Sequence, residues 1–127
     1  MEPSLAALIE SALAAEPAVL DAYVFGSVAR GEARAGSDID VAVFLDPAAA
    51  VPLPWGWAAS INTRLVEALG RNDVDVAILN RATPLLYHRV LRDGSLVVSR
   101  DRVATSEREL QARSRWLDWQ ACRARAA

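Results

Sequence analysis

Cysteine, lysine and long hydrophobic runs are scarce or missing in this chain of 127 residues. Cys122 is the one cysteine, so no internal disulfide can form, which favours a reducing compartment. No apolar run is long enough to cross a bilayer, and the opening Met-Glu-Pro-Ser lacks the basic segment of a signal peptide. We therefore expect a cytoplasmic protein that does not associate with membranes.

An excess of positive charge is also missing. The chain carries 14 basic residues, all of them arginine, against 16 acidic ones, for a formal net charge of -2. This balance disfavours general electrostatic capture of nucleic acid, so we expect no direct nucleic-acid binding. Hydrophobic residues make up 53% of the chain and charged residues 24%, which is typical of a globular domain and excludes disorder of its body. The length predicts a single domain over residues 1–127.

The hydrophobic pattern predicts strands and helices in alternation. Runs rich in β-branched residues predict strands over 19–25, 39–45, 74–79 and 96–98. Helical spacing predicts helices over about 4–15, 61–69, 84–93 and 102–124. Gly70 is expected to end the second helix, and Thr83-Pro84 to begin the third. Such alternation is typical of an α/β fold with a mixed sheet flanked by helices.

The most informative stretch lies between the first two predicted strands. Gly26 and Ser27 close the first strand, and Asp38 and Asp40 open the second. Two carboxylates two residues apart on an extended backbone leave the same face of the sheet and repel each other unless a cation neutralises them. Mg²⁺, which prefers carboxylate and phosphate oxygens, suits that place. The turn at Gly26-Ser27 is suited to holding phosphate, and Arg30 in the following loop is placed to neutralise it.

A third carboxylate completes a two-metal arrangement for phosphoryl or nucleotidyl transfer. The predicted third strand offers two candidates, Asp73 at its mouth and Asp75 inside it. Asp75 is flanked by Val74 and Val76, and a carboxylate among core residues is costly unless it has a partner. We therefore predict Asp75 as the third ligand and keep Asp73 as the reserve.

The order Phe-Gly-Ser-Val-Ala-Arg-Gly followed by Ser-Asp-Ile-Asp-Val-Ala-Val resembles the signature of the nucleotidyltransferase superfamily. The chain length is similar to that of its smallest members, the minimal nucleotidyltransferase (MNT) proteins. The stretches 74–80 and 91–94 are also similar to that family, so the resemblance covers most of the chain, from about residue 19 to 98. It implies a polymerase beta-like fold.

The resemblance also implies a function. Many MNT proteins are antitoxins encoded beside a HEPN ribonuclease toxin, and transfer AMP from ATP to a tyrosine hydroxyl of that toxin. By position, Gly26 and Ser27 would hold the triphosphate, and Asp38 and Asp40 would bind two Mg²⁺ ions. Asp75 would complete the metal site and help deprotonate the acceptor hydroxyl.

Two other functions remain open on the sequence. The first is an antitoxin that blocks its toxin by binding alone, although intact glycine, serine and aspartates argue against decay of the site. The second is a nucleotidyltransferase acting on a small molecule such as an aminoglycoside. Enzymes of that kind carry an additional helical domain for the acceptor, which this chain lacks.

The predicted last helix, about 102–124, has two apolar sides at helical spacing. One side comprises Leu110, Ser114, Leu117 and Ala121, and the other Ala112, Trp116 and Trp119. One side needs the domain body as its neighbour; the other predicts a partner, either the HEPN toxin or another copy of this chain. We expect the docking residues to be Trp116 and Trp119, because tryptophan is enriched among the residues that dominate interfaces.

Overall fold

The computed structural model describes residues 3–26 and 38–126. In chain order the elements are α1 (Pro3–Ala14), β1 (Val19–Phe25), β2 (Ile39–Leu45), α3 (Trp57–Leu69), β3 (Val74–Ile78), a short 3₁₀ turn η1 (Leu79–Arg81), α4 (Pro84–Asp93), β4 (Ser95–Ser99) and α5 (Arg102–Ala126). The predicted elements are all present within a few residues of their expected ends. Within the described part, every helix is too short or too polar to cross a membrane.

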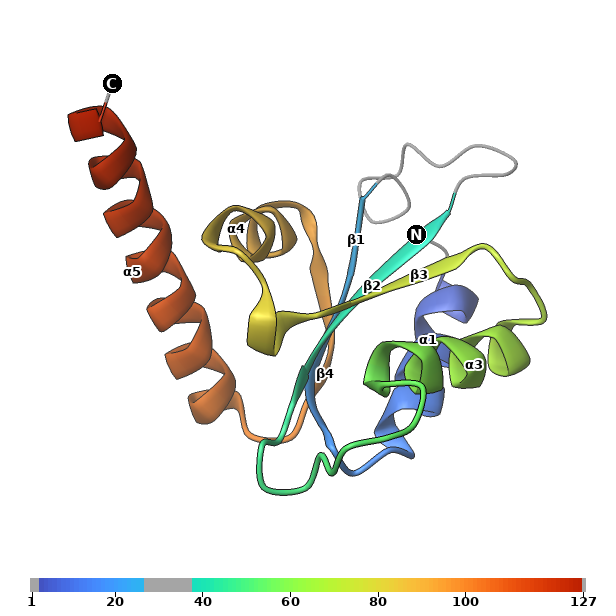
Figure 1. Ribbon diagram of the computed structural model, residues 1–127. Helices are drawn as coiled ribbons and strands as arrows, with labels where there is room; N and C mark the ends of the chain where they lie inside the picture. The colour runs from blue at the N-terminus through green and yellow to red at the C-terminus, as the bar shows by residue number, and fades with distance from the viewer. Residues whose placement is uncertain (1–2, 27–37, 127) are drawn as a thin grey trace.

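The four strands form one mixed sheet in the order β3-β2-β1-β4 (Figure 1). β1 runs antiparallel to both β2 and β4, whereas β2 runs parallel to β3. The predicted fold class is thereby confirmed. The first half of the chain thus supplies the centre of the sheet, and the later strands add to its two edges.

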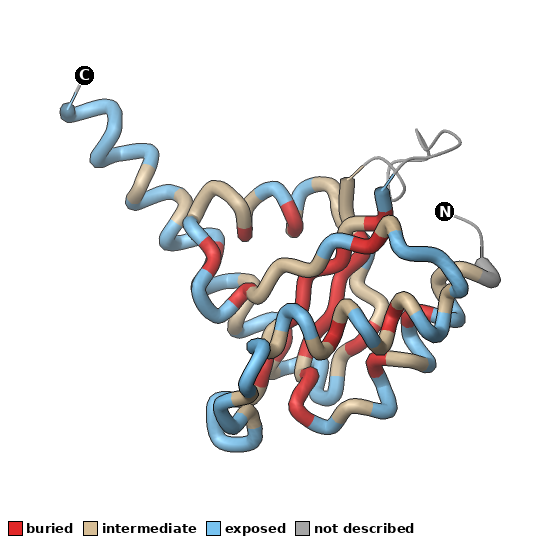
Figure 2. Tube along the Cα trace, turned by 45° about the vertical axis from the view of Figure 1, so that its right-hand side comes forward, coloured by how far each residue is buried: buried red, intermediate tan, exposed pale blue. Residues whose placement is uncertain are grey.

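Two helical layers cover the two faces of the sheet. α1 and α3 pack together on one face, and α4 and α5 pack together on the other (Figure 1). Because neighbouring strand residues point to opposite faces, β2 contributes Val41 and Val43 to the core under α1 and α3, and Ala42 to the core under α4. The buried residues accordingly concentrate along the sheet between the layers (Figure 2).

Helix ends follow local chemistry. α3 ends at Gly70, whose φ of 68° is the left-handed conformation of a helix C-terminus, and whose N–H donates to the Val66 carbonyl. The Thr83 hydroxyl accepts a hydrogen bond of 3.1 Å from the Leu86 N–H at the start of α4, where Pro84 takes the first helical position. Both caps were predicted from the sequence.

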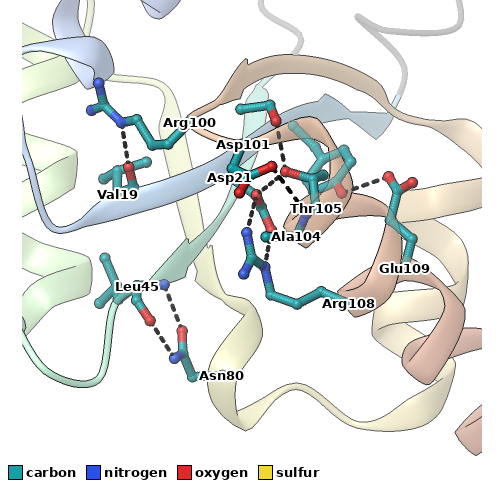
Figure 3. A network of polar contacts seen from close by, with 12 residues as sticks. Val19, Asp21, Leu45, Asn80, Arg100, Asp101, Ala104, Thr105, Arg108 and Glu109 are labelled. Atoms are coloured by element: carbon teal, nitrogen blue, oxygen red, sulfur yellow. Dashed lines mark hydrogen bonds and ion pairs between the residues drawn. The ribbon is translucent and has the colours of Figure 1, made fainter.

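A buried ion pair fixes the first half of α5 to the sheet. Asp21 of β1 is fully buried, and it accepts hydrogen bonds from Arg108 Nε at 2.7 Å and from the second guanidinium nitrogen at 2.8 Å. The Thr105 hydroxyl donates to the same carboxylate at 2.7 Å (Figure 3). Four residues along the helix, Glu109 accepts a hydrogen bond of 2.7 Å from the Tyr23 hydroxyl. α5 is therefore held by a satisfied polar network as well as by apolar contact.

Candidate functional site

The predicted site residues that the structure describes lie at one end of the sheet. Because β1 is antiparallel to β2, the end of β1 lies beside the start of β2; because β2 is parallel to β3, the starts of β2 and β3 also lie together. Phe25 is the register partner of Asp40, and Asp40 is the register partner of Asp75. Gly26, at the end of β1, is therefore beside the aspartates at this carboxylate edge, by which we mean Asp38, Asp40 and Asp75.

The three aspartates occupy strand positions of the same parity. Asp40 is two residues before Ala42 and Asp75 two before Ala77, and both alanines belong to the core under α4. Asp38 precedes Asp40 by the same interval. The carboxylate edge is therefore on the α4 and α5 side of the sheet, as the predicted alternation requires.

Both the backbone conformation and the neighbouring Asp40 side chain favour glycine at position 26. Its φ is 77°, in the left-handed region that L side chains rarely adopt. A Cβ built at this position would overlap Asp40 Oδ2 and would lie 3.3 Å from Asp40 Cγ. Only glycine lets the end of β1 approach the Asp40 carboxylate so closely.

The carboxylates of the edge act on one another electrostatically. The pKa of Asp40 is raised, first by partial burial and then by the negative charges of Asp75 and Asp38. The mutual repulsion predicted from the sequence is therefore present in the fold. It marks this edge as a place where a cation is favoured.

Asp73 and Asp75 have different surroundings. The Asp73 carboxylate forms a two-pronged ion pair with the Arg71 guanidinium, and this hydrogen bonding lowers the pKa of Asp73. The Asp73 carbonyl accepts a hydrogen bond of 2.8 Å from the Ile39 N–H, which joins the starts of β3 and β2. Asp75 instead lies opposite Asp40. The geometry thus favours Asp75 over Asp73 as the third carboxylate.

The reason given for choosing Asp75 was nevertheless wrong. We expected a carboxylate buried between Val74 and Val76, whereas the Asp75 side chain is exposed. β3 is an edge strand of the sheet, and its start is open to solvent at this face. Asp75 is therefore accessible to a large molecule approaching from outside.

The donor set has the chemistry of a magnesium site, but its side chains are not gathered around a point. Among the residues that the structure describes, no three histidine, cysteine or acidic side chains stand together as a metal-binding group. Carboxylate oxygens are nonetheless the ligands that Mg²⁺ prefers, and the raised pKa of Asp40 reflects a negative field that a cation would relieve. Ser27 and Arg30, the other predicted phosphate contacts, lie outside the described residues.

Sequence reasoning missed the role of Gly94, which it treated only as the end of a helix. A Cβ on Gly94 would overlap the Val90 carbonyl and would lie 3.2 Å from the Val24 carbonyl and 3.3 Å from the Phe25 Cβ. The end of α4 therefore packs directly on the end of β1, next to Gly26. The sequence contains the Arg92-Asp93-Gly94 stretch, but residue spacing alone does not indicate that this stretch lies against the end of β1.

The family model for the polymerase beta nucleotidyltransferase domain matches residues 8–103. The chain belongs to this nucleotidyltransferase family. The matched span contains Gly26 and the three aspartates of the carboxylate edge, whereas most of α5 follows it. The suspected resemblance is confirmed at the level of family and fold.

Solved structures share the fold of this nucleotidyltransferase. A crystal structure of a toxin–antitoxin with AMP-PNP is 24% identical, with a TM-score of 0.79 over 95% of this chain and 94% of that chain. A tri-AMPylated Shewanella oneidensis HEPN toxin in complex with MNT antitoxin gives 22% identity and a TM-score of 0.70, over 95% and 94%. A MntA–HepT toxin–antitoxin structure gives 22% and 0.74, over 98% and 95%. No curated protein matches the chain.

The tryptophans predicted to dock a partner pack within the chain. The Trp116 ring stacks on His88 of α4, with centroids 4.1 Å apart and planes 7° apart. Trp119 stacks on Trp116 at 5.1 Å, and the Arg123 guanidinium lies 4.8 Å from the centre of the Trp119 ring. Both rings are half-buried. Trp116 therefore packs on α4, and docking of a partner through the two tryptophans stays a prediction.

Proposed function

We propose that this nucleotidyltransferase is an MNT-type antitoxin that transfers AMP from ATP to a tyrosine hydroxyl of a cognate HEPN ribonuclease toxin, and so neutralises it. The observation that carries the proposal is the register pair Asp40–Asp75 beside Gly26. Structures that share the fold support the partner and the nucleotide, since they include a toxin–antitoxin with AMP-PNP and a tri-AMPylated HEPN toxin bound to MNT antitoxin. The reaction consumes ATP, and we place it in the cytoplasm.

Asp38, Asp40 and Asp75 would hold the magnesium ions. Their oxygens are hard donors, and the charge repulsion that raises the pKa of Asp40 would be relieved by a divalent cation. Bound magnesium would supply charge neutralisation for the phosphates and for the departing pyrophosphate. Gly26, with Ser27 and Arg30 after it, would hold the triphosphate beside the aspartates.

The transfer step releases one proton, that of the acceptor hydroxyl, which a base must accept. The acceptor hydroxyl oxygen bonds to the α-phosphorus of ATP, the bond from that phosphorus to the oxygen bridging to the β-phosphate breaks, and pyrophosphate leaves. The hydroxyl proton passes to a carboxylate oxygen of Asp75, which is open to solvent. The product is an AMP phosphodiester on the tyrosine.

The openness of the carboxylate edge favours a macromolecular acceptor. Asp38 and Asp75 are both exposed, and β3 has no further strand beyond it in the sheet. A tyrosine carried on another protein can reach such an edge without a dedicated cavity, because the partner brings its own surface.

The direct test is to purify the chain with its genetically adjacent candidate toxin, add ATP and Mg²⁺, and measure the intact mass of the toxin. We expect the mass to increase by whole AMP units, and expect no increase with Asp40→Asn or without a divalent cation. Glu67→Gln, on the exposed surface of α3, is the matched control. A toxin that is inhibited while its mass stays unchanged would overturn the catalytic proposal in favour of neutralisation by binding.

A further inference from the structure

The side of α5 that faces away from the body is apolar and uncovered. Val103, Leu110 and Leu117 are 69%, 65% and 63% exposed, although all three are large hydrophobic residues. On the opposite side of the helix, Thr105 and Ala112 are buried against the body. The sequence-based prediction that this helix has two apolar sides is therefore confirmed, but the free side is the one without tryptophan. Exposed rows of this kind mark interaction sites.

The spacing of the free side is that of a helix that packs on another helix. The three large residues recur every seven positions. Beyond Leu110 small residues continue the row at steps of four and three, whereas Glu107 stands between Val103 and Leu110. We call this row the outer stripe; it comprises Val103, Leu110, Ser114, Leu117, Ala121 and Ala124. A seven-residue repeat keeps one stripe turned toward a partner helix along its length. Shallow hollows lie on both sides of Leu110, where side chains of a second helix can fit.

Over residues 102–118 the two flanks of the outer stripe carry opposite charges. At about 100° per residue, Arg102 and Arg113 lie along one flank, and Glu107 and Asp118 lie along the other. All four are exposed. Neither Arg113 nor Asp118 makes an ion pair within the described part of the chain. Their charges are therefore available to a partner.

We propose that the outer stripe binds a second copy of this chain, with the two α5 helices parallel. A two-fold axis along parallel helices brings each basic flank against the acidic flank of the other copy, whereas an antiparallel pair brings like flanks together. The parallel pair places Arg113 beside Asp118 of the second copy, five residues further along, the usual spacing of such interhelical pairs. Symmetry forms this contact twice.

The shape of the molecule permits this pairing. α5 lies at one side of the molecule (Figure 1), and the outer stripe is exposed on the side of α5 opposite the buried Thr105 and Ala112. Pairing two copies therefore leaves the two bodies on opposite sides of the helix pair. The helix has 25 residues, which is about 37 Å of contact length. The carboxylate edge is not on α5 and remains open in each copy. The inference therefore stands or falls separately from the proposed transferase activity.

Charge-reversal variants test both the pairing of the two α5 helices and their parallel orientation. Arg113→Glu and Asp118→Arg should each raise the dimer dissociation constant at least about fivefold, since two pairs become repulsive. The double variant Arg113→Glu/Asp118→Arg should restore it. Analytical ultracentrifugation of the purified chain over a concentration series measures these constants, and thermal melting verifies that each variant folds. Glu67→Arg on exposed α3 is the control.

A disulfide trap gives a second readout. In a Cys122→Ser background, Ala121→Cys should form a disulfide-linked dimer on mild oxidation, because a parallel pair places identical stripe residues opposite each other. Ala68→Cys on α3 should not. A chain that stays monomeric throughout the concentration series would overturn the proposal, and so would a dimer indifferent to both charge reversals. If Leu110→Asp abolishes toxin binding in a monomeric chain, the stripe belongs to the toxin instead.

Discussion

Asp40 of β2 is the register partner of Asp75 of β3, and Gly26 approaches the same Asp40 carboxylate from β1. The ends of three neighbouring strands therefore bring two negative charges and one glycine together. The pKa of Asp40 is raised as a result, by burial and then by Asp75 and Asp38. A fold that tolerates this repulsion gives up stability at its functional site.

Removal of the Asp40 charge should stabilise the protein. With a pKa raised above its ordinary 3.8, Asp40 binds protons more readily in the folded than in the unfolded chain, and its charge destabilises the fold at neutral pH. Solvent screening limits the effect, so we expect Asp40→Asn to raise Tm by about 1–3 °C at pH 7. The difference from the parent should shrink as pH falls through the raised pKa and vanish below 3.8. A loss of Tm would contradict this account.

Divalent cations should stabilise the parent chain. A ligand that binds only the folded state adds about 1.4 kcal/mol when its concentration is tenfold above Kd. We expect Mg²⁺ or Mn²⁺ to raise Tm of the parent in a concentration-dependent way, and to lose that effect in Asp40→Asn. Differential scanning fluorimetry with Glu67→Gln on exposed α3 as the control measures this without reference to catalysis. An equal rise in the parent and in Asp40→Asn would place the cation elsewhere.

Substitutions at Asp75 and at Asp73 should affect the rate of AMP transfer differently. Asp75→Asn keeps the side-chain shape but loses the charge opposite Asp40, and we expect AMP transfer to the toxin to fall roughly 100-fold or more. Asp73→Asn breaks only the exposed pair with Arg71, so both transfer and stability should be retained. Single-turnover transfer rates for the two variants decide it; the reverse pattern would make Asp73 the third carboxylate.

Much of the fold could be predicted because its signals are local. Gly70 and the Thr83-Pro84 pair end and begin helices through their own backbone chemistry, and both are found in those roles. The polar network between β1 and α5 could not be predicted, because Asp21 and Arg108 are 87 positions apart and nothing in the sequence connects them. The strand order could not be predicted for the same reason. The parallel pairing of β2 and β3, which brings Asp75 to Asp40, depends on the whole sheet and not on a local signal.

The outer surface of α5 illustrates a different limit of prediction from sequence. Helical spacing identified the two apolar sides, but not which side the body would cover. We assigned the free side to the tryptophans on the basis of their frequency in interfaces. Trp116 instead stacks on His88, a contact between helices that only tertiary packing creates.

Gly26 should be the least replaceable of the glycines with positive φ. Gly26→Ala adds a Cβ that overlaps Asp40 Oδ2, whereas a Cβ at Gly56, with a φ of 83°, meets nothing within 4 Å. Both substitutions carry the backbone cost of a left-handed residue, about 1 kcal/mol. We expect Gly26→Ala to cost more than Gly56→Ala in urea unfolding and to abolish transfer, while Gly56→Ala leaves transfer intact. Equal costs would show that the approach to Asp40 is not the constraint.

The buried pair between Asp21 and Arg108 should be costly to break from one side. Arg108→Met removes both guanidinium hydrogen bonds and leaves Asp21 charged and fully buried, with Thr105 as its remaining donor. An uncompensated buried charge of this kind costs about 3–5 kcal/mol. By contrast, Arg92→Met disrupts an exposed pair with Asp93 and should leave stability nearly unchanged.

Replacement of both partners distinguishes a charge effect from a packing effect. In Asp21→Asn/Arg108→Met the buried group is neutral and Thr105 can still donate to it, so the double variant should recover a large part of the stability lost in Arg108→Met. Urea unfolding of the two single variants and the double variant gives the coupling free energy directly. If the losses in the single variants simply add, the guanidinium stabilises the fold through its contacts with neighbouring side chains such as Phe44, whose ring centre lies 5.0 Å away.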